Sequence, residues 1–231
     1  MQHHRSKARL LDATIKVVRT KGYTATRIED VCAEAGVTKG SFFHHFKTKD
    51  DLALAALEHW KSGSGDLFRQ ADYHGLPDPL DRVLAYIDFR KALLTGEIPE
   101  FTCFAGTMLQ EMHATNPPIR SACESSICGH AATLATDVAA AMRRYPIAAD
   151  VTAENLALHM QCVIQGAFIL AKAKASAAVA ADSLEHLRRY LLLLFRSRDA
   201  GLPHADPPVK ATAAGPRRGR RQPNTREGKP A

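Results

Sequence analysis

Three helix-start signals crowd into one short stretch near the N-terminus. Thr26 and Glu29 have the spacing of a capping box, in which the threonine hydroxyl accepts from the Glu29 amide and the carboxylate reaches back to the cap. Thr38 is the next candidate N-cap, and Thr48 is the third, with Asp51 at the fourth position of its segment. Such closely spaced caps allow only short helices, which we predict at about 27–34, 38–46 and 48–61.

The first of these short helices is predicted to end in a glycine turn. Cys32 is a small residue on that helix, Gly36 follows four residues later, and Thr38 opens the next helix. A helix-turn-helix needs this spacing, because a small residue and a glycine allow the second helix to cross the first and enter the major groove of DNA. A longer helix over about 6–21, stopped by Gly22, is predicted to precede the motif.

Helical periodicity continues far beyond this motif, and strand signals are scarce. The predicted fold class is therefore all-α, with an N-terminal three-helix helix-turn-helix domain and a C-terminal helical domain. The runs Ser62–Gly65 and Gly75–Pro79 are predicted to break the helical pattern. Later helices are predicted at about 80–95, 101–115, 118–144, 152–175 and 182–198, the last preceded by the alanine-rich stretch 175–181. The predicted domains are residues 1–50, residues 51–200 and a disordered basic tail over 201–231.

The net charge of +7 is unevenly divided along the chain. Residues 1–50 carry ten Lys or Arg against five Asp or Glu, residues 51–208 carry fourteen against eighteen, and residues 209–231 carry seven against one. A basic end is therefore expected to meet a polyanion. A membrane is disfavoured, because neither end has an interfacial apolar face and no apolar run reaches about 18 residues. We expect nucleic acid as the partner, and a cytoplasmic protein because no secretory signal is present.

The motifs of the common enzyme classes are missing from the sequence. There is no Ser-His-Asp ordering, H-E-x-x-H, phosphate loop or C-x-x-C, and the eleven histidines follow no ligand spacing. We therefore expect no enzyme, no metal and no cofactor. The five cysteines are expected to be free and mostly buried: Cys32, Cys103, Cys123, Cys128 and Cys162. An architectural DNA binder driven by the basic run Arg217–Arg221 is a competing interpretation, and so is a tail without a dedicated role.

The run from Val37 to Leu52, VTKGSFFHHFKTKDDL, resembles the DNA-binding domain of the TetR family, and the similarity covers nearly all of the first 52 residues. The resemblance implies a transcriptional regulator, most often a repressor, that binds an inverted-repeat operator as a dimer and is released by a small-molecule ligand. It also implies direct contacts with bases and phosphates. The residues expected to contact DNA are Arg27, Thr38, Lys39, Gly40, Ser41, Phe43, His44 and Lys49.

Two positions depart from the family's usual pattern, and a third remains open. Cys32 stands where alanine is common, which the packing is expected to tolerate. Phe43 stands where a tyrosine usually donates to a phosphate, so that contact is expected to be missing, although the ring can pack against a sugar or a thymine methyl group. His45 is compatible with a DNA contact and with a packed ring. The basic residues Lys16, Arg19 and Lys21 are expected to form a solvated face of the first helix, away from the groove.

For the C-terminal half, the resemblance implies a helical domain that binds a small molecule and forms a homodimer. Helices 152–175 and 182–198 are apolar over so much of their circumference that they need cover on more than one side, so we expect them to form the dimer's four-helix bundle. The expected ligand-binding residues are Phe89, Cys103, Phe104, Met108, Met112, Gln161, Gln165 and Phe168, with Phe101 as a further wall. Glu111, His113 and His159 are further candidates for polar contacts.

Cys103 raises an alternative function of the same fold. Its segment resembles a helix start found in a TetR subset, some of whose members sense electrophiles or oxidants through that cysteine. A helix N-terminus lowers the pKa of a thiol and makes it more reactive. No Lys, Arg or His lies beside Cys103 in the sequence, however, and Glu100 would oppose the thiolate. A thiol-based sensor acting through Cys103 therefore stays as the alternative.

Overall fold

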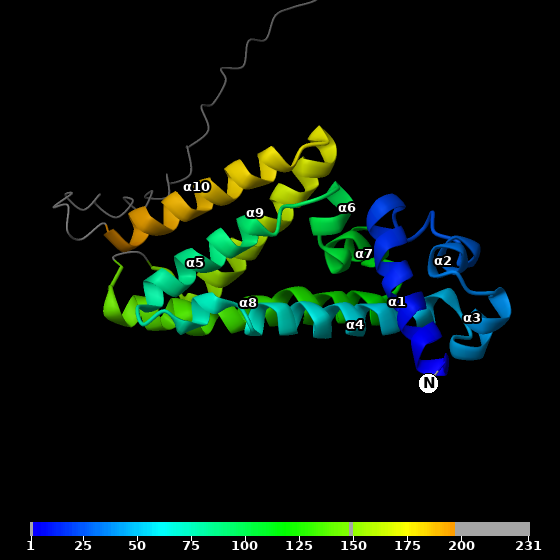
Figure 1. The fold of residues 1–231 in the computed structure, drawn as a ribbon. Coiled ribbons are helices and arrows are strands. Elements are labelled where there is room, and N and C mark those ends of the chain that lie inside the picture. The colour runs from blue at the N-terminus through cyan, green and yellow to red at the C-terminus, as the bar shows by residue number, and fades with distance from the viewer. Residues whose placement is uncertain (1, 148–149, 197–231) are drawn as a thin grey trace, which may run out of the picture. The chain divides into compact units, whose positions relative to one another are not determined.

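The computed structural model describes residues 2–147 and 150–196, and within these ranges the regular elements are helices (Figure 1). The all-α fold with an N-terminal helix-turn-helix is confirmed. In chain order the elements are α1 (Gln2–Lys21), α2 (Ile28–Ala35), α3 (Lys39–His45), α4 (Lys49–Arg69), the 3₁₀ turn η1 (Asp72–Gly75), α5 (Pro79–Ala92), α6 (Ile98–Phe101), α7 (Phe104–Met112), α8 (Pro117–Arg144), α9 (Ala153–Lys174) and α10 (Ala177–Arg196).

The turn between α2 and α3 has the geometry expected of a helix-turn-helix. Gly36 adopts a left-handed conformation with φ 59°, which a residue without a Cβ reaches at little cost. The N–H of Val37 then donates to the carbonyl of Cys32 at 3.0 Å and closes the end of α2. The hydroxyl of Thr38 accepts from the N–H of Ser41 at 3.2 Å and caps α3, as predicted.

The cap of α2 lies one residue later than predicted. The N-cap is Arg27, whose backbone N–H donates to the carboxylate of Asp30 at 2.8 Å. Thr26 is buried, and its hydroxyl donates to the carbonyl of Gly22 at 2.6 Å, so it is not available as a cap. Glu29 pairs instead with Lys39 on α3. The predicted third cap is confirmed, since the Thr48 hydroxyl accepts from the N–H of Asp51 at 3.0 Å.

Two predicted helix boundaries are wrong for reasons of tertiary packing. The glycine-serine run 62–65 does not end α4, which continues to Arg69 and buries Phe68 near its end. Each glycine in a helix costs about 1 kcal/mol relative to alanine, and burial of one phenylalanine offsets a cost of that size. α10 begins at Ala177, inside the alanine-rich stretch, because Ala180 packs in a small cluster with Ala167 and Ala171 of α9.

The predicted helix over 101–115 is divided in two. α6 ends at Phe101, Thr102 and Cys103 are extended, and α7 then starts with Cys103 as its N-cap. The break matters because it turns the Cys103 side chain toward the N–H of Gly106, which donates to Sγ at 3.3 Å.

The buried side chains form two main clusters. One joins α1–α4 to α7 and the start of α8, with Phe42, Leu52, Phe104 and Ile119 among its fully buried members. The other joins the end of α4 to α5, α8, α9 and α10. α4 runs through both, beside α8 (Figure 1). The predicted boundary at residue 50 stays a prediction, and the predicted disordered tail over 201–231 lies outside the described residues.

Among the helices that the structure describes, α9 is the one long and apolar enough to cross a membrane by length and composition. Of its most apolar window, 44% is buried against the rest of the chain. Its buried side is accounted for by the second cluster, to which Leu156, Met160 and Ile164 belong.

Candidate functional site

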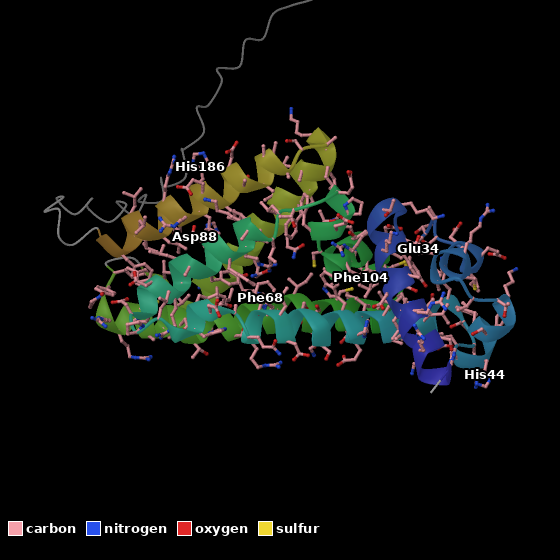
Figure 2. All side chains as sticks on the ribbon, in the orientation of Figure 1. Glu34, His44, Phe68, Asp88, Phe104 and His186 are labelled. Atoms are coloured by element: carbon pink, nitrogen blue, oxygen red, sulfur yellow. The ribbon has the colours of Figure 1, made fainter. Side chains whose placement is uncertain are left out.

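The N-terminal half of α3 presents an exposed polar face with one aromatic ring. Lys39, Gly40 and His44 are exposed, and Ser41 is half-buried. Phe43 is 56% exposed, and its ring meets the buried Phe42 edge-on at a centroid distance of 5.0 Å. His44 projects from α3 away from the core (Figure 2). The predicted division into inward Phe42 and Phe46 and outward Lys39, Phe43 and His44 is therefore confirmed.

The two lysines predicted to hold DNA have different surroundings. Lys39 is exposed and pairs with Glu29 of α2. Lys49 is half-buried, and its Nζ donates to the carbonyls of Tyr23 and Thr26, both at 3.1 Å. The ammonium also lies 4.1 Å from the centroid of the Tyr23 ring. The hydrogen bonds of Lys49 therefore connect the loop between α1 and α2 to the start of α4.

The histidine left open by the sequence, His45, is packed. Its Nε2 lies 2.8 Å from the hydroxyl of Ser6 on α1, and its ring contacts Phe46 at a centroid distance of 6.2 Å. Arg27 is exposed at the start of α2. The side chains that surround α3 thus combine exposed cations with hydrogen-bonding groups at the N-terminus of a helix.

A cavity of about 910 Å³ lies between α1, α4, α5, α6, α8 and α9. Of the predicted ligand-binding residues, Cys103, Gln161, Gln165 and Phe168 line it, together with Phe101. Phe104 and Met108 are fully buried in the first cluster, and Met112 packs against that cluster. Phe89 lines a smaller cavity of about 580 Å³. The interior position of Phe68, another wall of the larger cavity, is visible in Figure 2.

A hydrogen-bonded group built around Tyr86 fixes one polar part of this cavity. The Tyr86 hydroxyl accepts from Arg90 Nε at 2.9 Å and from Gln161 Nε2 at 3.0 Å. It lies 3.0 Å from Nε2 of His130, to which it donates, since its two acceptor positions are already occupied. Burial, aided by the charge of Arg90, lowers the pKa of His130 to about 3, so this ring is neutral at pH 7.

Arg19 is a wall of the cavity that the sequence did not reveal. It is half-buried and lines the cavity from α1, so the expectation of a solvated face is wrong at this position. Its guanidinium carbon lies 5.1 Å from the centroid of the Trp60 ring. Its Nε and Nη2 are shielded from water and have no hydrogen-bond partner. Burial lowers the pKa of Arg19 to about 10. The two neighbouring lysines differ, since Lys16 pairs with Glu34 and Lys21 with Asp30.

Cys103 lies in the wall of the same cavity. It is half-buried, and the charges of Arg19 and Lys172 interact electrostatically with it. The sequence placed no cation beside this thiol, because Arg19 comes from α1 and Lys172 from α9. All five cysteines are free; Cys32 and Cys123 are buried, but Cys128 and Cys162 are exposed, so the expectation that most are buried is wrong.

The remaining predicted polar groups lie away from the cavity. Glu111 of α7 accepts from the backbone N–H groups of Tyr23 at 2.9 Å and Thr24 at 2.7 Å. His113 is exposed at the C-terminal end of α7. His159 on α9 contacts the ring of Tyr190 on α10 at a centroid distance of 5.4 Å. Within the described ranges, no group of three or more His, Cys, Asp or Glu could hold a metal ion.

The outer faces of α9 and α10 carry exposed apolar side chains. On α9, Leu158, Cys162 and Ile169 are exposed and follow helical spacing, with Gly166 on the same stripe. A Cβ added to Gly166 would meet no atom within 4 Å, so this position is open to an incoming surface. Tyr190 and Leu193 are exposed large apolar residues of α10. The two last helices therefore offer an apolar surface that the described part of the chain leaves uncovered.

Two segments match described protein families. Residues 10–56 match the family of bacterial regulatory proteins, tetR family, and residues 79–187 match the tetracyclin repressor-like C-terminal domain. The first segment holds α2 and α3, and the second holds most of the cavity wall. Together the two matches cover more than half of the chain.

Individual transcriptional regulators are also similar to this chain in sequence or structure. Transcriptional regulator AcuR of Cereibacter sphaeroides is 29% identical over 113 residues, 49% of this chain and 52% of AcuR. The HTH-type transcriptional regulator TtgR of Pseudomonas putida is 27% identical over 172 residues, 70% of this chain and 77% of TtgR. The match spans about half of AcuR and only 19% and 26% of two other curated relatives. A crystal structure of regulatory protein TetR from Rhodobacter sphaeroides superposes with a TM-score of 0.70 and 25% identity, covering 83% of this chain and 97% of that one.

Proposed function

The chain belongs to the tetR family of bacterial regulatory proteins and is a transcriptional regulator, and we propose that it is a dimeric repressor released from its operator by a small molecule. The observation that carries the proposal is the exposed face of α3, held by Gly36 and Thr38 at an angle to α2. This face has the small, polar and cationic side chains that a recognition helix needs in the major groove.

The proposed DNA contacts are those expected from the sequence. They are Arg27, Thr38, Lys39, Gly40, Ser41, Phe43, His44 and Lys49. The Thr38 hydroxyl already caps α3, which leaves its remaining hydrogen-bonding capacity for a phosphate. Lys49 uses two of its three N–H donors on the carbonyls of Tyr23 and Thr26, and the third is left for a phosphate.

A dimer through α9 and α10 is the second part of the proposal. The exposed stripe of Leu158, Cys162 and Ile169, with Gly166 in its middle, supports close packing of two copies. One recognition helix reads only a few base pairs. Two helices placed about 34 Å apart would read an inverted repeat in successive major grooves.

Release by a small molecule is the third part. The cavity of about 910 Å³ is large enough for a drug-sized ligand, and Ile15 and Arg19 of α1 form part of its wall. A ligand there would contact the DNA-binding domain directly. A ligand that favours a conformer with wrongly spaced recognition helices would lower operator affinity by the coupling free energy, typically about 1–3 kcal/mol.

Selection of binding sites from random-sequence duplex DNA by the full chain tests the proposal. We expect an inverted repeat, and we expect the variant K39A/H44A to lose it while remaining a dimer. The exposed variant Lys61→Ala, on the neighbouring α4, is the matched control for loss of a cation. A chain lacking residues 205–231 that no longer selects any sequence would favour the architectural, tail-driven interpretation over this one.

A thiol sensor is the second candidate function, because Cys103 lines the cavity and interacts electrostatically with Arg19 and Lys172. An electrophile bound there would be attacked by the thiolate. Treatment with N-ethylmaleimide, followed by mass spectrometry and an operator-binding assay, compares the natural chain with Cys103→Ser. Loss of operator binding that the substitution prevents would favour this candidate; loss that persists would exclude it. Neither candidate function is enzymatic, and we infer that the protein acts in the cytoplasm in either case.

A further inference from the structure

Two arginines on different helices line the cavity without a carboxylate partner. They are Arg19 on α1 and Arg90 on α5. Among the described residues no carboxylate lies within ion-pair distance of either one. Arg82, which is also half-buried, shows the ordinary arrangement, because its Nε lies 2.7 Å from the carboxylate of Asp137. A cavity wall with two arginines that form no ion pair favours a ligand with a negative charge.

The unpaired atoms of Arg19 are a matched pair. Nε and Nη2 carry the two N–H bonds that point in the same direction along one edge of the guanidinium, and both lack a hydrogen-bond partner. A carboxylate binds such an edge with both of its oxygens. The Trp60 ring near the guanidinium contributes no oxygen acceptor. Two hydrogen bonds that one carboxylate could accept are therefore unmade at this side chain, and because both atoms are shielded from water, a ligand reaches them only if the side chain moves.

Arg90 is held in place with its outer nitrogens unused. Its Nε donates to the Tyr86 hydroxyl, and its guanidinium carbon lies 4.4 Å from the centroid of the Phe68 ring. Tyr86 is in turn fixed by Gln161 and His130. The two Nη groups of Arg90 have no hydrogen-bond partner in the described part of the chain. A cation that is already oriented loses little conformational entropy when a ligand binds.

The other charges of the wall lie toward its exposed part. Asp12 is exposed and bonds to His59 at 2.8 Å, and Lys16 is directed to Glu34. Glu97 and Glu100 are exposed, and Glu100 accepts from the backbone N–H of Glu97 at 2.9 Å. The charge of Glu100 attracts Arg19 electrostatically, but neither arginine forms an ion pair with these acids. Apolar rings complete the wall: Trp60, Phe68, Phe101 and Phe168.

We propose that the ligand of this cavity is an organic acid with a bulky apolar body. Its carboxylate binds Arg90 and also attracts the Arg19 side chain, which moves to donate hydrogen bonds to it. The apolar body lies among the aromatic rings, and the carboxylate completes the hydrogen bonding of both guanidinium groups. Because Arg19 belongs to α1, binding couples the acid to the DNA-binding domain. The role of this acid as the effector rests on the proposed function, whereas its binding to the cavity does not.

Calorimetric titration of the full-length protein with matched acids and amides tests the proposal. The probes are naphthoate and naphthamide, decanoate and decanamide, which differ within each pair only in the charged group. We expect the acid of at least one pair to bind about tenfold or more tightly than its amide. Arg90→Gln and Arg19→Gln should each weaken binding of the acid by about tenfold and leave binding of the amide unchanged.

Controls separate this effect from misfolding and from loss of charge elsewhere. Arg69→Gln removes an exposed arginine outside the cavity and should not change the preference for the acid. Arg90→Lys keeps the charge and should restore part of the preference, and circular dichroism verifies the fold of each variant. Equal affinity for acid and amide, no binding of either acid at millimolar concentration, or a preference that survives in R19Q/R90Q would each overturn the proposal.

The titration contains no DNA, so it fails independently of the proposed function. A protein that prefers the acid but selects no operator would overturn the proposed function and leave this inference intact. A protein that selects an operator but binds the amide equally well would overturn this inference alone.

Discussion

The carboxylate of Glu111, near the end of α7, accepts a hydrogen bond from the backbone N–H of Tyr23, 2.9 Å away in the loop between α1 and α2. The next N–H, that of Thr24, donates to the same carboxylate at 2.7 Å. Cys103, the N-cap of α7, lies in the cavity wall, and Glu111 lies near the other end of the helix. One short helix therefore connects the cavity wall with the loop that precedes α2.

Replacing Glu111 by alanine should lower the free energy of unfolding by about 1–3 kcal/mol, because two backbone donors lose their acceptor. Burial raises the pKa of Glu111, but the hydrogen bonds from Thr24 and Tyr23 outweigh it and hold the pKa below its usual value. The stabilisation is therefore present above the ordinary pKa of a glutamate and is lost as the pH falls below it. Urea unfolding measures the effect, with the exposed Glu124→Ala as control. Equal stability of the two variants would contradict the role of Glu111.

Lys49 and Lys39 should respond differently to substitution, although both are expected to contact DNA. Lys49→Met leaves the carbonyls of Tyr23 and Thr26 without a donor and should cost about 1–3 kcal/mol of stability. Lys39→Ala loses only an exposed pair with Glu29 and should change stability by about 0.5 kcal/mol or less. Thermal unfolding compares the two.

The variant Lys39→Ala should also bind its operator with a weaker salt dependence. The slope of log K against log salt concentration should decrease in magnitude by about 0.9 for each phosphate contact that Lys39 makes.

Phe43→Tyr should strengthen operator binding. Phe43 is exposed on α3, so an added hydroxyl can reach a phosphate without disturbing the buried Phe42. A hydrogen bond to a charged group contributes about 1.5–3 kcal/mol, and the lower end of this range corresponds to roughly tenfold in affinity. Fluorescence anisotropy on the selected operator measures this, with Phe43→Ala as the variant expected to bind more weakly. Tyr and Ala variants that both bind like the natural chain would place Phe43 away from the DNA.

His130 should make the protein sensitive to mild acid. Its pKa falls from the usual 6.5 to about 3 on folding, so the unfolded chain binds more protons between these two values and stability decreases as the pH falls through that window. Between pH 7 and pH 5 this group alone should cost about 2 kcal/mol. His130→Gln keeps an acceptor for Tyr86 and should remove this part of the pH dependence. Urea unfolding at pH 7 and pH 5 measures the loss of stability in the natural chain and in His130→Gln. An equal loss in the two proteins would mean that His130 does not titrate in this way.

Ile169→Glu should separate the proposed dimer into monomers. Ile169 is exposed on α9 in line with Leu158 and Gly166, so a carboxylate there would be buried without a partner if two copies pack together. Light scattering after size exclusion gives the mass. Leu76→Glu, an exposed leucine outside the last two helices, serves as the control. If both variants keep the mass of the natural protein, α9 is not the interface.

The sequence predicted the parts of the fold that short-range chemistry determines. The turn at Gly36 and the caps at Thr38 and Thr48 depend on residues a few positions apart, and these predictions are confirmed. The early end of α4 was wrong, because glycines 63 and 65 signal a break while the burial of Phe68 depends on α5 and α8. The Thr26 cap was wrong because the carbonyl of Gly22 binds its hydroxyl.

The candidate site was predictable to different degrees in its two halves. The outward face of α3 follows from helical spacing within one helix. The cavity wall depends on how six helices pack together, so Phe104 and Met108 could be recognised as large and apolar but not as core residues outside the cavity. Arg19 carried no local signal, since a basic residue on α1 is ordinarily solvated. Its burial depends on tertiary packing, in which Trp60 of α4 lies against the guanidinium.

The buried cluster that joins α1–α4 to α7 and the start of α8 bears on how this protein can be recombined. Exchanging the first 50 residues for those of a relative, as a way to redirect the regulator to another promoter, would cut through packed side chains, because Phe104 and Ile119 pack in the same cluster as Phe42 and Leu52. A functional chimera therefore requires that the transplanted segment bring its own counterparts of α7 and the start of α8, or that these contacts be redesigned together. The part of the chain that would have to be exchanged is thus larger than the segment proposed to contact DNA.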